Sequence, residues 1–166
     1  DQSLQFPRFY VTAAAPCPYL PDREERKVFT ELKGKDAAAL NESLSRVGFR
    51  RSQSVAYRPA CEACSSCISV RVPVRDFVAN RRMRRILTRN RDLVAGRRVP
   101  VVRQEHYELL TRYLADRHSE GGMADMDIHE FADMVENSPV ETMLVEYRTR
   151  EDVGAPGRLV GVALSD

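Results

Sequence analysis

The chain has 166 residues, of which 43% are hydrophobic and 30% charged, and its formal net charge is +2 at pH 7. This is the composition of a globular protein, and no run of about 18 apolar residues occurs, which excludes a membrane-spanning helix. The apolar stretch at 11–15 is too short for the hydrophobic region of a secretory signal and no basic cluster precedes it, so we do not expect it to be one. Four cysteines in a chain of this size do not suggest a disulfide framework. We therefore expect a cytoplasmic protein.

The first part of the chain has the pattern of two helices. Asp22 and Glu25 have the spacing of a capping box, so a helix is expected to begin there and to end at Gly34. Asp36 is expected to begin a second helix, which Gly48 ends as the residue after the C-terminal cap.

An extended segment, a cysteine-containing loop and a strand are expected next. The residues at 49–58 are predicted to be extended, and those at 59–67 to form a loop with three of the four cysteines. Hydrophobic and polar residues alternate at 68–74, which predicts a strand, although Pro73 indicates an edge strand or a strand end.

Three helices and two strands are expected in the rest of the chain. The helices are predicted at 80–94, at 103–118 and from Asp127 to Ser138, and the strands at 140–148 and 158–164, around a turn at 154–157. The apolar stripe of the first of these helices, expected to be buried, consists of Met83, Ile86, Leu87 and Val94.

Charge is distributed unevenly along the chain. The segment 71–98 has ten arginines against two acids, and the segment 116–152 has eleven acids against three arginines. Arginine binds phosphate through two parallel hydrogen bonds, so the arginine-rich helix predicted at 80–94 indicates a nucleic-acid binding site. The alternative is that these arginines form a solvated helix face whose charge balances the acidic segment 116–152. This helix has no aromatic side chain to stack on bases, which favours a folded, helical RNA. The candidate RNA-binding residues are Arg81, Arg82, Arg84, Arg85, Arg89 and Arg91.

The cysteines form a triplet with one distant member. Cys61, Cys64 and Cys67 are separated by two residues each, and Cys17 lies upstream. Four thiolates can bind a zinc ion or an iron–sulfur cluster. The ligands of a zinc site usually come from two pairs of residues close in sequence. Here three cysteines lie together and the fourth is distant, which favours an iron–sulfur cluster. The alternatives are four reduced thiols in a packed loop and a redox switch.

Arginines near the cysteine loop are candidates for binding an acidic group. In an extended segment, alternation is expected to put Arg50 and Arg58 on one face and Arg51 on the other, and Tyr57 can add a hydroxyl. Any surface arginine can bind a carboxylate or a phosphate, so the residue types alone indicate a site only weakly.

Six short motifs occur in an order that resembles one known family, the bacterial aspartate/glutamate leucyltransferases, which are relatives of the eukaryotic arginyl-tRNA–protein transferases. The resemblance runs from about residue 6 to residue 166. Eukaryotic relatives have cysteines where this chain has Leu20 and Glu62. The motifs are Cys17-Pro18-Tyr19-Leu20-Pro21, Gly48-Phe49-Arg50-Arg51-Ser52-Gln53, Tyr57-Arg58-Pro59-Ala60-Cys61, Arg89-Asn90-Arg91-Asp92-Leu93, Arg117-His118 with Gly121-Gly122-Met123, and Leu159-Val160-Gly161-Val162-Ala163.

The resemblance implies an enzyme that transfers leucine from leucyl-tRNA to proteins with N-terminal Asp or Glu, which marks them for proteolysis. Arg50, Tyr57 and Arg58 are then expected to bind the acceptor. The donor ester is already activated, so the chemistry needs no cofactor, and His118 is a candidate base. Eukaryotic relatives bind an iron–sulfur cluster through their cysteines, so the resemblance implies that Cys17 and Cys61 are cluster ligands. For Cys64 and Cys67 this role is inferred only from their spacing in the sequence.

The expected fold is α+β. An N-terminal, cysteine-containing domain is expected at 1–80, a basic helix and connection at 81–103, and the front part of a GNAT-like acyltransferase domain at 104–166. The strand at 68–74 can join the second sheet. The chain starts at Asp1 and stops after an apolar, strand-like run, so we expect missing sequence and an inactive fragment. The alternative functions are an acyl-CoA-dependent GNAT transferase and an RNA-binding zinc or iron–sulfur module without transferase activity.

Overall fold

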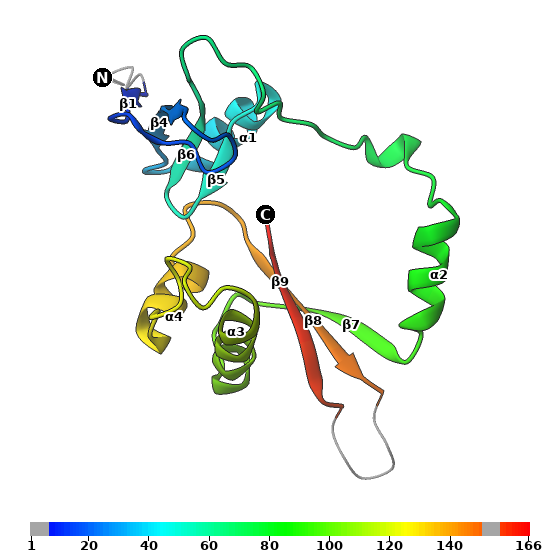
Figure 1. Cartoon of the computed structure of the whole chain (residues 1–166). Coiled ribbons are helices and arrows are strands. Elements are labelled where there is room, and N and C mark those ends of the chain that lie inside the picture. The colour runs from blue at the N-terminus through cyan, green and yellow to red at the C-terminus, as the bar shows by residue number, and fades with distance from the viewer. Residues whose placement is uncertain (1–6, 151–156) are drawn as a thin grey trace. The chain divides into compact units, whose positions relative to one another are not determined.

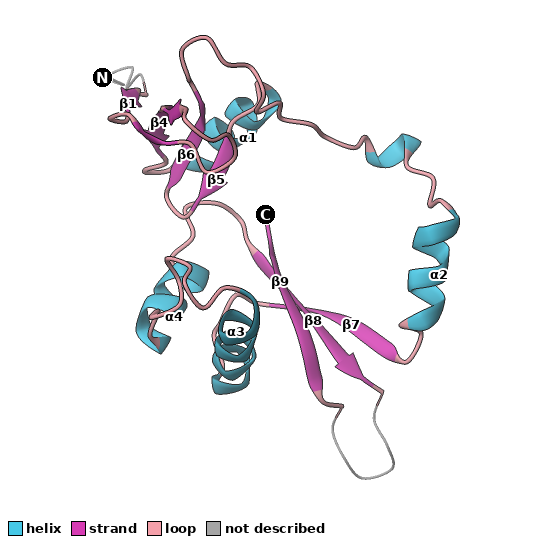
Figure 2. Ribbon diagram, viewed as in Figure 1, coloured by secondary structure: helices cyan, strands magenta, loops and turns pink. Residues whose placement is uncertain are grey.

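The computed structural model describes residues 7–150 and 157–166. The chain forms two compact units, Asp1–Pro73 and Val74–Asp166, and each has its own sheet and helices (Figures 1 and 2). The structure is therefore a mixture of helices and sheets, as expected for an α+β protein. No helix among the described residues is long and apolar enough to cross a membrane.

The first unit is built on a four-stranded antiparallel sheet in the order β1-β4-β6-β5, beside a two-stranded ribbon of β2 and β3. Its core consists of the buried residues Leu32, Ala37, Leu44 and Ala56, with Phe49 packed against them. The elements are β1 (Tyr10–Val11), β2 (Ala15–Pro16), β3 (Glu24–Glu25), β4 (Lys27–Glu31), α1 (Ala37–Arg46), β5 (Arg50–Ser52) and β6 (Val55–Pro59).

The prediction of a helix from Asp22 to Gly34 is wrong: the structure has the strands β3 and β4 there. All five residues of β4 pair with β6, and Thr30 is buried with its hydroxyl donating to the carbonyl of Arg8 at 2.7 Å. Pairing with strands that lie far away in the sequence outweighs the local capping pattern. The second helix is confirmed as α1, and Gly48 follows it with φ of +90°.

The strand predicted at 68–74 is also wrong. No strand occurs there, and the only regular structure is a 3₁₀ turn at Val74–Asp76. The alternating apolar side chains are exposed, by 73% for Ile68 and 87% for Val70, so the alternation is not matched by burial against a neighbouring strand. The segment predicted to be extended at 49–58 is extended on both sides of a turn at 53–54, and so forms the hairpin of β5 and β6 and not a single strand. The cysteine loop that follows it is confirmed.

The second unit contains a three-stranded antiparallel sheet in the order β7-β8-β9, with two helices in the chain between β7 and β8. Phe131 and Val135 of one helix pack on Leu144 of the sheet as a buried cluster, joined by Tyr107 and Leu110. The elements are α2 (Arg81–Arg89), β7 (Leu93–Arg98), α3 (Gln104–Arg117), α4 (Ile128–Glu136), β8 (Met143–Thr149) and β9 (Leu159–Ser165).

The basic helix is shorter than predicted. The side chain of Asn80 accepts from the backbone N–H of Met83 and begins α2, which ends at Arg89 because residues from Leu93 onward pair with β8. Val94 therefore belongs to a strand. The prediction that the apolar stripe of this helix is buried is wrong, because Ile86 is 49% exposed and Leu87 is 68% exposed.

The remaining elements follow the sequence-based expectation. The helix at 103–118 is α3, and α4 begins with the predicted capping box, in which Asp127 accepts from two backbone N–H groups and Glu130 accepts from the N–H of Asp127. The two predicted strands are β8 and β9, although β8 begins three residues later than expected. Part of the predicted turn, at 154–156, lies outside the described residues.

Candidate functional site

A hollow of about 380 Å³ lies beside the cysteine loop of the first unit, and we call it the cysteine hollow. Arg50 of β5 and Tyr57 of β6 both line it, because they are directly paired across the hairpin and share a face of the sheet. The charged residues around it are of both signs, and Lys27 is paired with Glu25 at 2.7 Å. The charged lining residues are Arg23, Glu24, Glu25, Lys27 and Arg50.

The four cysteines all line this hollow, but their sulfur atoms do not gather around one point. In a zinc site the sulfurs lie about 2.3 Å from one ion and so are neighbours of each other. Among the described residues, no three cysteine sulfurs lie within 4.8 Å of one another. The thiol of Cys61 instead points to the carbonyl of Arg26, at 3.7 Å. The thiols as they stand are not a preformed zinc site.

One thiol of the loop has an altered acidity. The backbone N–H and the hydroxyl of Ser66 hydrogen-bond to Cys64, and Arg23 lies nearby, so the pKa of the Cys64 thiol is lowered from its ordinary value. The thiolate is the nucleophilic and metal-binding form of cysteine. Cys64 is therefore the cysteine of this hollow in which that form is favoured.

Arg58 does not share a face with Arg50, so that expectation is wrong. The hairpin pairs Arg50 with Tyr57 and Arg51 with Ala56, and Ala56 is fully buried against α1. Since Arg58 lies two residues from Ala56 in β6, it points to the α1 side of the sheet. There it lies over the ring of Phe49, 5.3 Å from the centroid.

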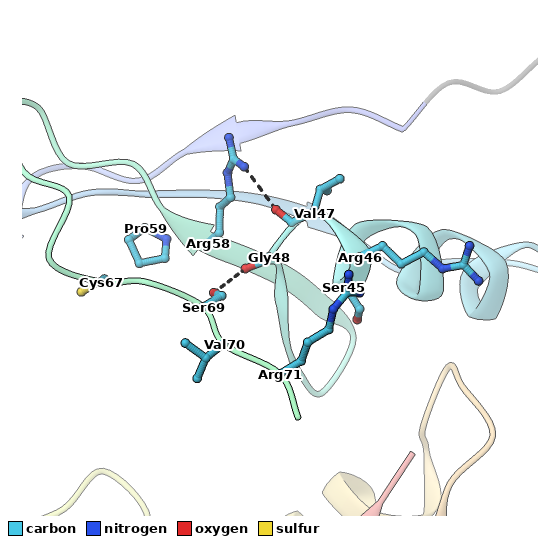
Figure 3. A pocket seen from close by; sticks show the side chains of 10 residues that line it. All are labelled: Ser45, Arg46, Val47, Gly48, Arg58, Pro59, Cys67, Ser69, Val70 and Arg71. Atoms are coloured by element: carbon cyan, nitrogen blue, oxygen red, sulfur yellow. Dashed lines mark hydrogen bonds between the residues drawn. The ribbon is translucent and has the colours of Figure 1, made fainter. Parts of the chain in front are cut away.

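A second hollow, of about 550 Å³, lies on the α1 side of the first unit (Figure 3). We call it the arginine hollow, because Arg46, Arg58 and Arg71 line it and no acid does. Arg46 lies near the end of α1, Arg58 lies on β6, and Arg71 lies on the segment that follows the cysteine loop. Arg50 and Arg58 therefore line two different hollows, one of mixed charge and one purely basic, which have Pro59 and Cys67 in common.

The arginines predicted to bind RNA lie on α2 and directly after it. All nine residues of α2 are exposed. Among the described residues, none of these arginines forms an ion pair, and one of them, Arg84, donates to the carbonyl of Ala79 near the start of the helix. The guanidinium groups of the helix are therefore available to an external anion.

His118, the candidate base, follows the last turn of α3. Its Nε2 lies 3.2 Å from the hydroxyl of Tyr113, and the two rings are 5.4 Å apart. Both side chains are exposed. Its ring is open to solvent, and the described residues provide no carboxylate hydrogen-bonded to it.

The second unit contains a buried charge network that the sequence did not indicate. Glu146 of β8 is 1% exposed and accepts hydrogen bonds from Nε2 of His106, at 2.8 Å, and from Arg148, at 3.0 Å. Arg148 also bonds to Glu105, and Arg98 lies 3.3 Å from Glu146. Glu105, His106 and Glu146 lie close enough to share a cation, but the guanidinium groups already supply the positive charge.

This network holds Glu146 in its charged form. Burial favours the neutral acid, but the hydrogen bonds from Arg148 and His106 outweigh it and lower the pKa of Glu146 from 4.5 to about 2. His106 also caps α3, because its Nδ1 accepts the backbone N–H of Arg103 at 3.1 Å. The network therefore joins the start of α3 to the sheet. No single sequence window contains it, because His106 and Glu146 are 40 residues apart.

Comparison with known proteins shows the family to which the chain belongs. Residues 15–85 match a family model described as "Arginine-tRNA-protein transferase, N terminus", and residues 105–166 match the corresponding C-terminal model. The aspartate/glutamate leucyltransferase of Sphingopyxis alaskensis is 56% identical over 98% of this chain and 63% of its own length. The one of Azorhizobium caulinodans is 53% identical over 100% of this chain and 69% of its own length. The chain belongs to the aspartate/glutamate leucyltransferase family.

The match to these relatives covers only part of their length. The chain spans 62% of the leucyltransferase of Sphingomonas elodea, with 54% identity, and 63% to 69% of the two relatives above. No solved structure matches the chain. The activity of the whole protein is therefore a matter for proposal.

Proposed function

We propose that the protein to which this chain belongs transfers leucine from leucyl-tRNA to the α-amine of proteins that begin with Asp or Glu. The modified proteins are then substrates for proteolysis, in the cytoplasm. The observation that carries the proposal is the 52% to 56% identity, over almost the whole chain, to proteins named aspartate/glutamate leucyltransferase. The sites described above support it, because it requires one surface for RNA and another for an acidic N-terminus.

The reaction replaces an ester by an amide. The acceptor's amine nitrogen attacks the carbonyl carbon of the leucyl ester, and the bond from that carbon to the terminal ribose oxygen of the tRNA breaks. That oxygen takes up one proton, and the amine nitrogen gives one up. Holding the two reactants together can lower the barrier by about 7–11 kcal/mol. A free α-amine has a pKa near 8, so a weak base such as His118, or water, suffices, and no cofactor is required.

The cysteine hollow is the proposed site for the acceptor's first residue. An N-terminal Asp or Glu presents a carboxylate beside an amine. Arg50 can bind the carboxylate through two parallel hydrogen bonds, and the hydroxyl of Tyr57, on the same face, can add a third. Glu24 of the same hollow is the polar group that suits an amine. Arg58, which was expected to take part, lies on the opposite face and is left out of this site.

The donor is proposed to bind through α2. Its arginines are exposed and carry no ion pair among the described residues, and helical RNA is recognised largely through its phosphates and shape. The proposed phosphate contacts are Arg81, Arg82, Arg84, Arg85, Arg89 and Arg91.

The finer organisation of the second unit is also a proposal. The antiparallel order β7-β8-β9, with α3 and α4 between the first two strands, supports a GNAT-like acyltransferase domain. This domain includes β7, which pairs with β8, and so begins before residue 104, where the sequence led us to expect its start. The N-terminal domain, expected at 1–80, and the basic helix α2 precede it. An iron–sulfur cluster at the cysteine hollow would require the loop that carries Cys61, Cys64 and Cys67 to rearrange around it, and the reaction does not depend on it.

The test uses the full-length protein, leucyl-tRNA labelled on leucine, and peptides that differ only in their first residue. We expect label on peptides that begin with Asp or Glu, and a rate at least about tenfold lower with Ala, because the acceptor carboxylate is worth a charge-assisted hydrogen bond. Equal rates with all three peptides would contradict the proposed specificity. RNA binding without transfer would favour an RNA-binding module, and transfer only from acyl-CoA would favour the other alternative.

A further inference from the structure

The arginine hollow has no part in the function proposed so far. It is open on the α1 side of the first unit, and its polar side chains are two serines and three arginines. A basic hollow without a lining acid is poorly suited to a cation or to an apolar group. Its charge suits an anion.

Two of its three arginines have no acidic partner in the part of the chain that the structure describes. The guanidinium of Arg58 donates to the carbonyl of Val47 at 3.4 Å and lies over Phe49, and among the described residues neither Arg58 nor Arg71 forms an ion pair. Arg46 is different, because it is paired with Glu42 at 2.5 Å. In Figure 3, Arg71 extends toward Ser45, Arg46 extends away from the hollow along α1, and Arg58 extends toward the carbonyl of Val47.

The segment that carries Arg71 is anchored to the sheet side of the hollow. The hydroxyl of Ser69 donates to the carbonyl of Gly48 at 2.8 Å, in the turn that follows α1. Among the described residues, the backbone N–H groups of Val70 and Arg71 donate to no carbonyl. Val70, Arg71, Ser45 and Arg58, which carry these N–H groups, a hydroxyl and two guanidinium groups without an ion pair among the described residues, all line the one hollow.

We propose that the arginine hollow binds a phosphate of the tRNA backbone, with Arg58 and Arg71 as its two cationic ligands. The inference rests on the proposed function, in which the donor is a tRNA, and adds an RNA contact in the first unit to the one on α2. A phosphate presents several anionic oxygens and can take two guanidinium forks at once. The acceptor has a single side-chain carboxylate at its first residue, and in the proposed function Arg50, on the opposite face of the sheet, binds that carboxylate. Phosphate therefore fits this hollow better than the acceptor does.

The test removes both cations from the hollow in the full-length protein. The variant Arg58→Gln/Arg71→Gln is compared with Lys35→Gln/Arg112→Gln, which removes the same charge from two exposed residues outside the hollow. Affinity for leucine tRNA is measured over a series of KCl concentrations. Each lost phosphate contact flattens the log–log salt dependence by about 0.9. We expect a slope flatter by about 0.9, the value for one lost phosphate contact, and affinity at least about tenfold lower at low salt, with a smaller change in the control.

A slope equal to that of the control would overturn the inference. An unchanged tRNA affinity with a raised KM for the acceptor peptide would overturn it too, and would assign the hollow to the acceptor protein. Arg58→Lys, which keeps the charge and loses the fork, should fall between wild type and Arg58→Gln, and thermal unfolding of each variant checks its folding. The proposed function is tested separately by leucyl transfer in the wild type: if it fails there while the tRNA slopes differ as expected, only that function is contradicted.

Discussion

Arg50 is the residue on which acceptor selection depends in this proposal. It lies opposite Tyr57 in the hairpin and lines the cysteine hollow. Substitution of Arg50 by Ala removes the fork that binds the acceptor carboxylate, so we predict a rise of about tenfold or more in the KM for peptides that begin with Asp or Glu. The affinity for tRNA should stay near that of the wild type. The measurement is steady-state leucylation of the peptides, with tRNA binding measured in parallel.

The matched control for this prediction is Lys35→Ala, which removes an exposed cation of the same unit that lines neither hollow. It should leave the KM for the acceptor unchanged. If Arg50→Ala behaves like Lys35→Ala, the carboxylate is bound elsewhere. If it weakens tRNA binding instead, Arg50 contacts phosphate and the assignment to the acceptor is wrong.

Glu146 should contribute to stability in a pH-dependent way. Its pKa falls from 4.5 to about 2 in the folded state, so its contribution is fully present above about pH 4.5 and is lost as the pH drops toward 2. We predict that Glu146→Gln lowers the free energy of unfolding by about 3 kcal/mol at pH 7, because it removes the anion shared by the buried His106 and the partly buried Arg148. Urea unfolding between pH 7 and pH 3 measures this.

The same experiment contains its own check. The difference between wild type and Glu146→Gln should shrink as the pH falls from about 4.5, since the wild type then loses what the variant already lacks. Glu108→Gln, which changes an exposed carboxyl of α3, should have a much smaller effect at pH 7. A pH-independent difference would mean that the variant acts by altered packing and not by the loss of charge.

The helix α2 is the element on which RNA affinity should depend most. Arg85 and Arg89 lie one turn apart on it, both exposed. We predict that Arg85→Glu/Arg89→Glu weakens binding of tRNAs of any sequence and flattens the log–log salt dependence by roughly two or more, because phosphate contacts carry no sequence information. Binding of several tRNAs over a salt series tests it. An unchanged slope would mean that these arginines only balance the acidic residues of the same chain.

The hairpin β5–β6 is the element that assigns Arg50 to the cysteine hollow and Arg58 to the arginine hollow. Its register pairs Arg50 with Tyr57, so Tyr57 and Arg58, which are neighbours in the sequence, point to opposite faces. A shift of one residue in this register would put Arg58 beside the cysteines instead. The assignment of acceptor and RNA contacts in the first unit therefore follows from strand pairing.

For the molecule as a whole, we predict that leucyl transfer does not require zinc. The leucyl ester is already activated, and the enzyme's contribution is to position it against an α-amine, a fraction of which is neutral near pH 7 because its pKa is near 8. Treatment of the full-length protein with a zinc chelator should leave the transfer rate near that of untreated protein, with metal content measured alongside. A loss of activity that added zinc restores would contradict this, and brown protein from anaerobic purification would indicate an iron–sulfur cluster at the cysteine hollow.

Much of the second unit could be predicted from the sequence, because its signals are local. The capping box of Asp127 and Glu130 begins α4, Asn80 caps α2, and the apolar runs of β8 and β9 form strands. The six motifs also identified the family, since they depend on residue identity alone. The clustering of arginines was likewise visible, and the structure adds that those of α2 are exposed.

Tertiary structure alone decided what depends on pairing between distant segments. The residues expected to form a helix before Gly34 became β4, because β6 supplies five paired residues to them. The strand expected at 68–74 did not form, since no partner strand lies beside it. Glu146 and His106 met across 40 residues, and the hairpin put Arg50 and Arg58 on opposite faces. Helix capping depends on residues a few positions apart, so the sequence shows it directly. Strand pairing and the neutralisation of buried charge depend on residues that only the folded chain brings together.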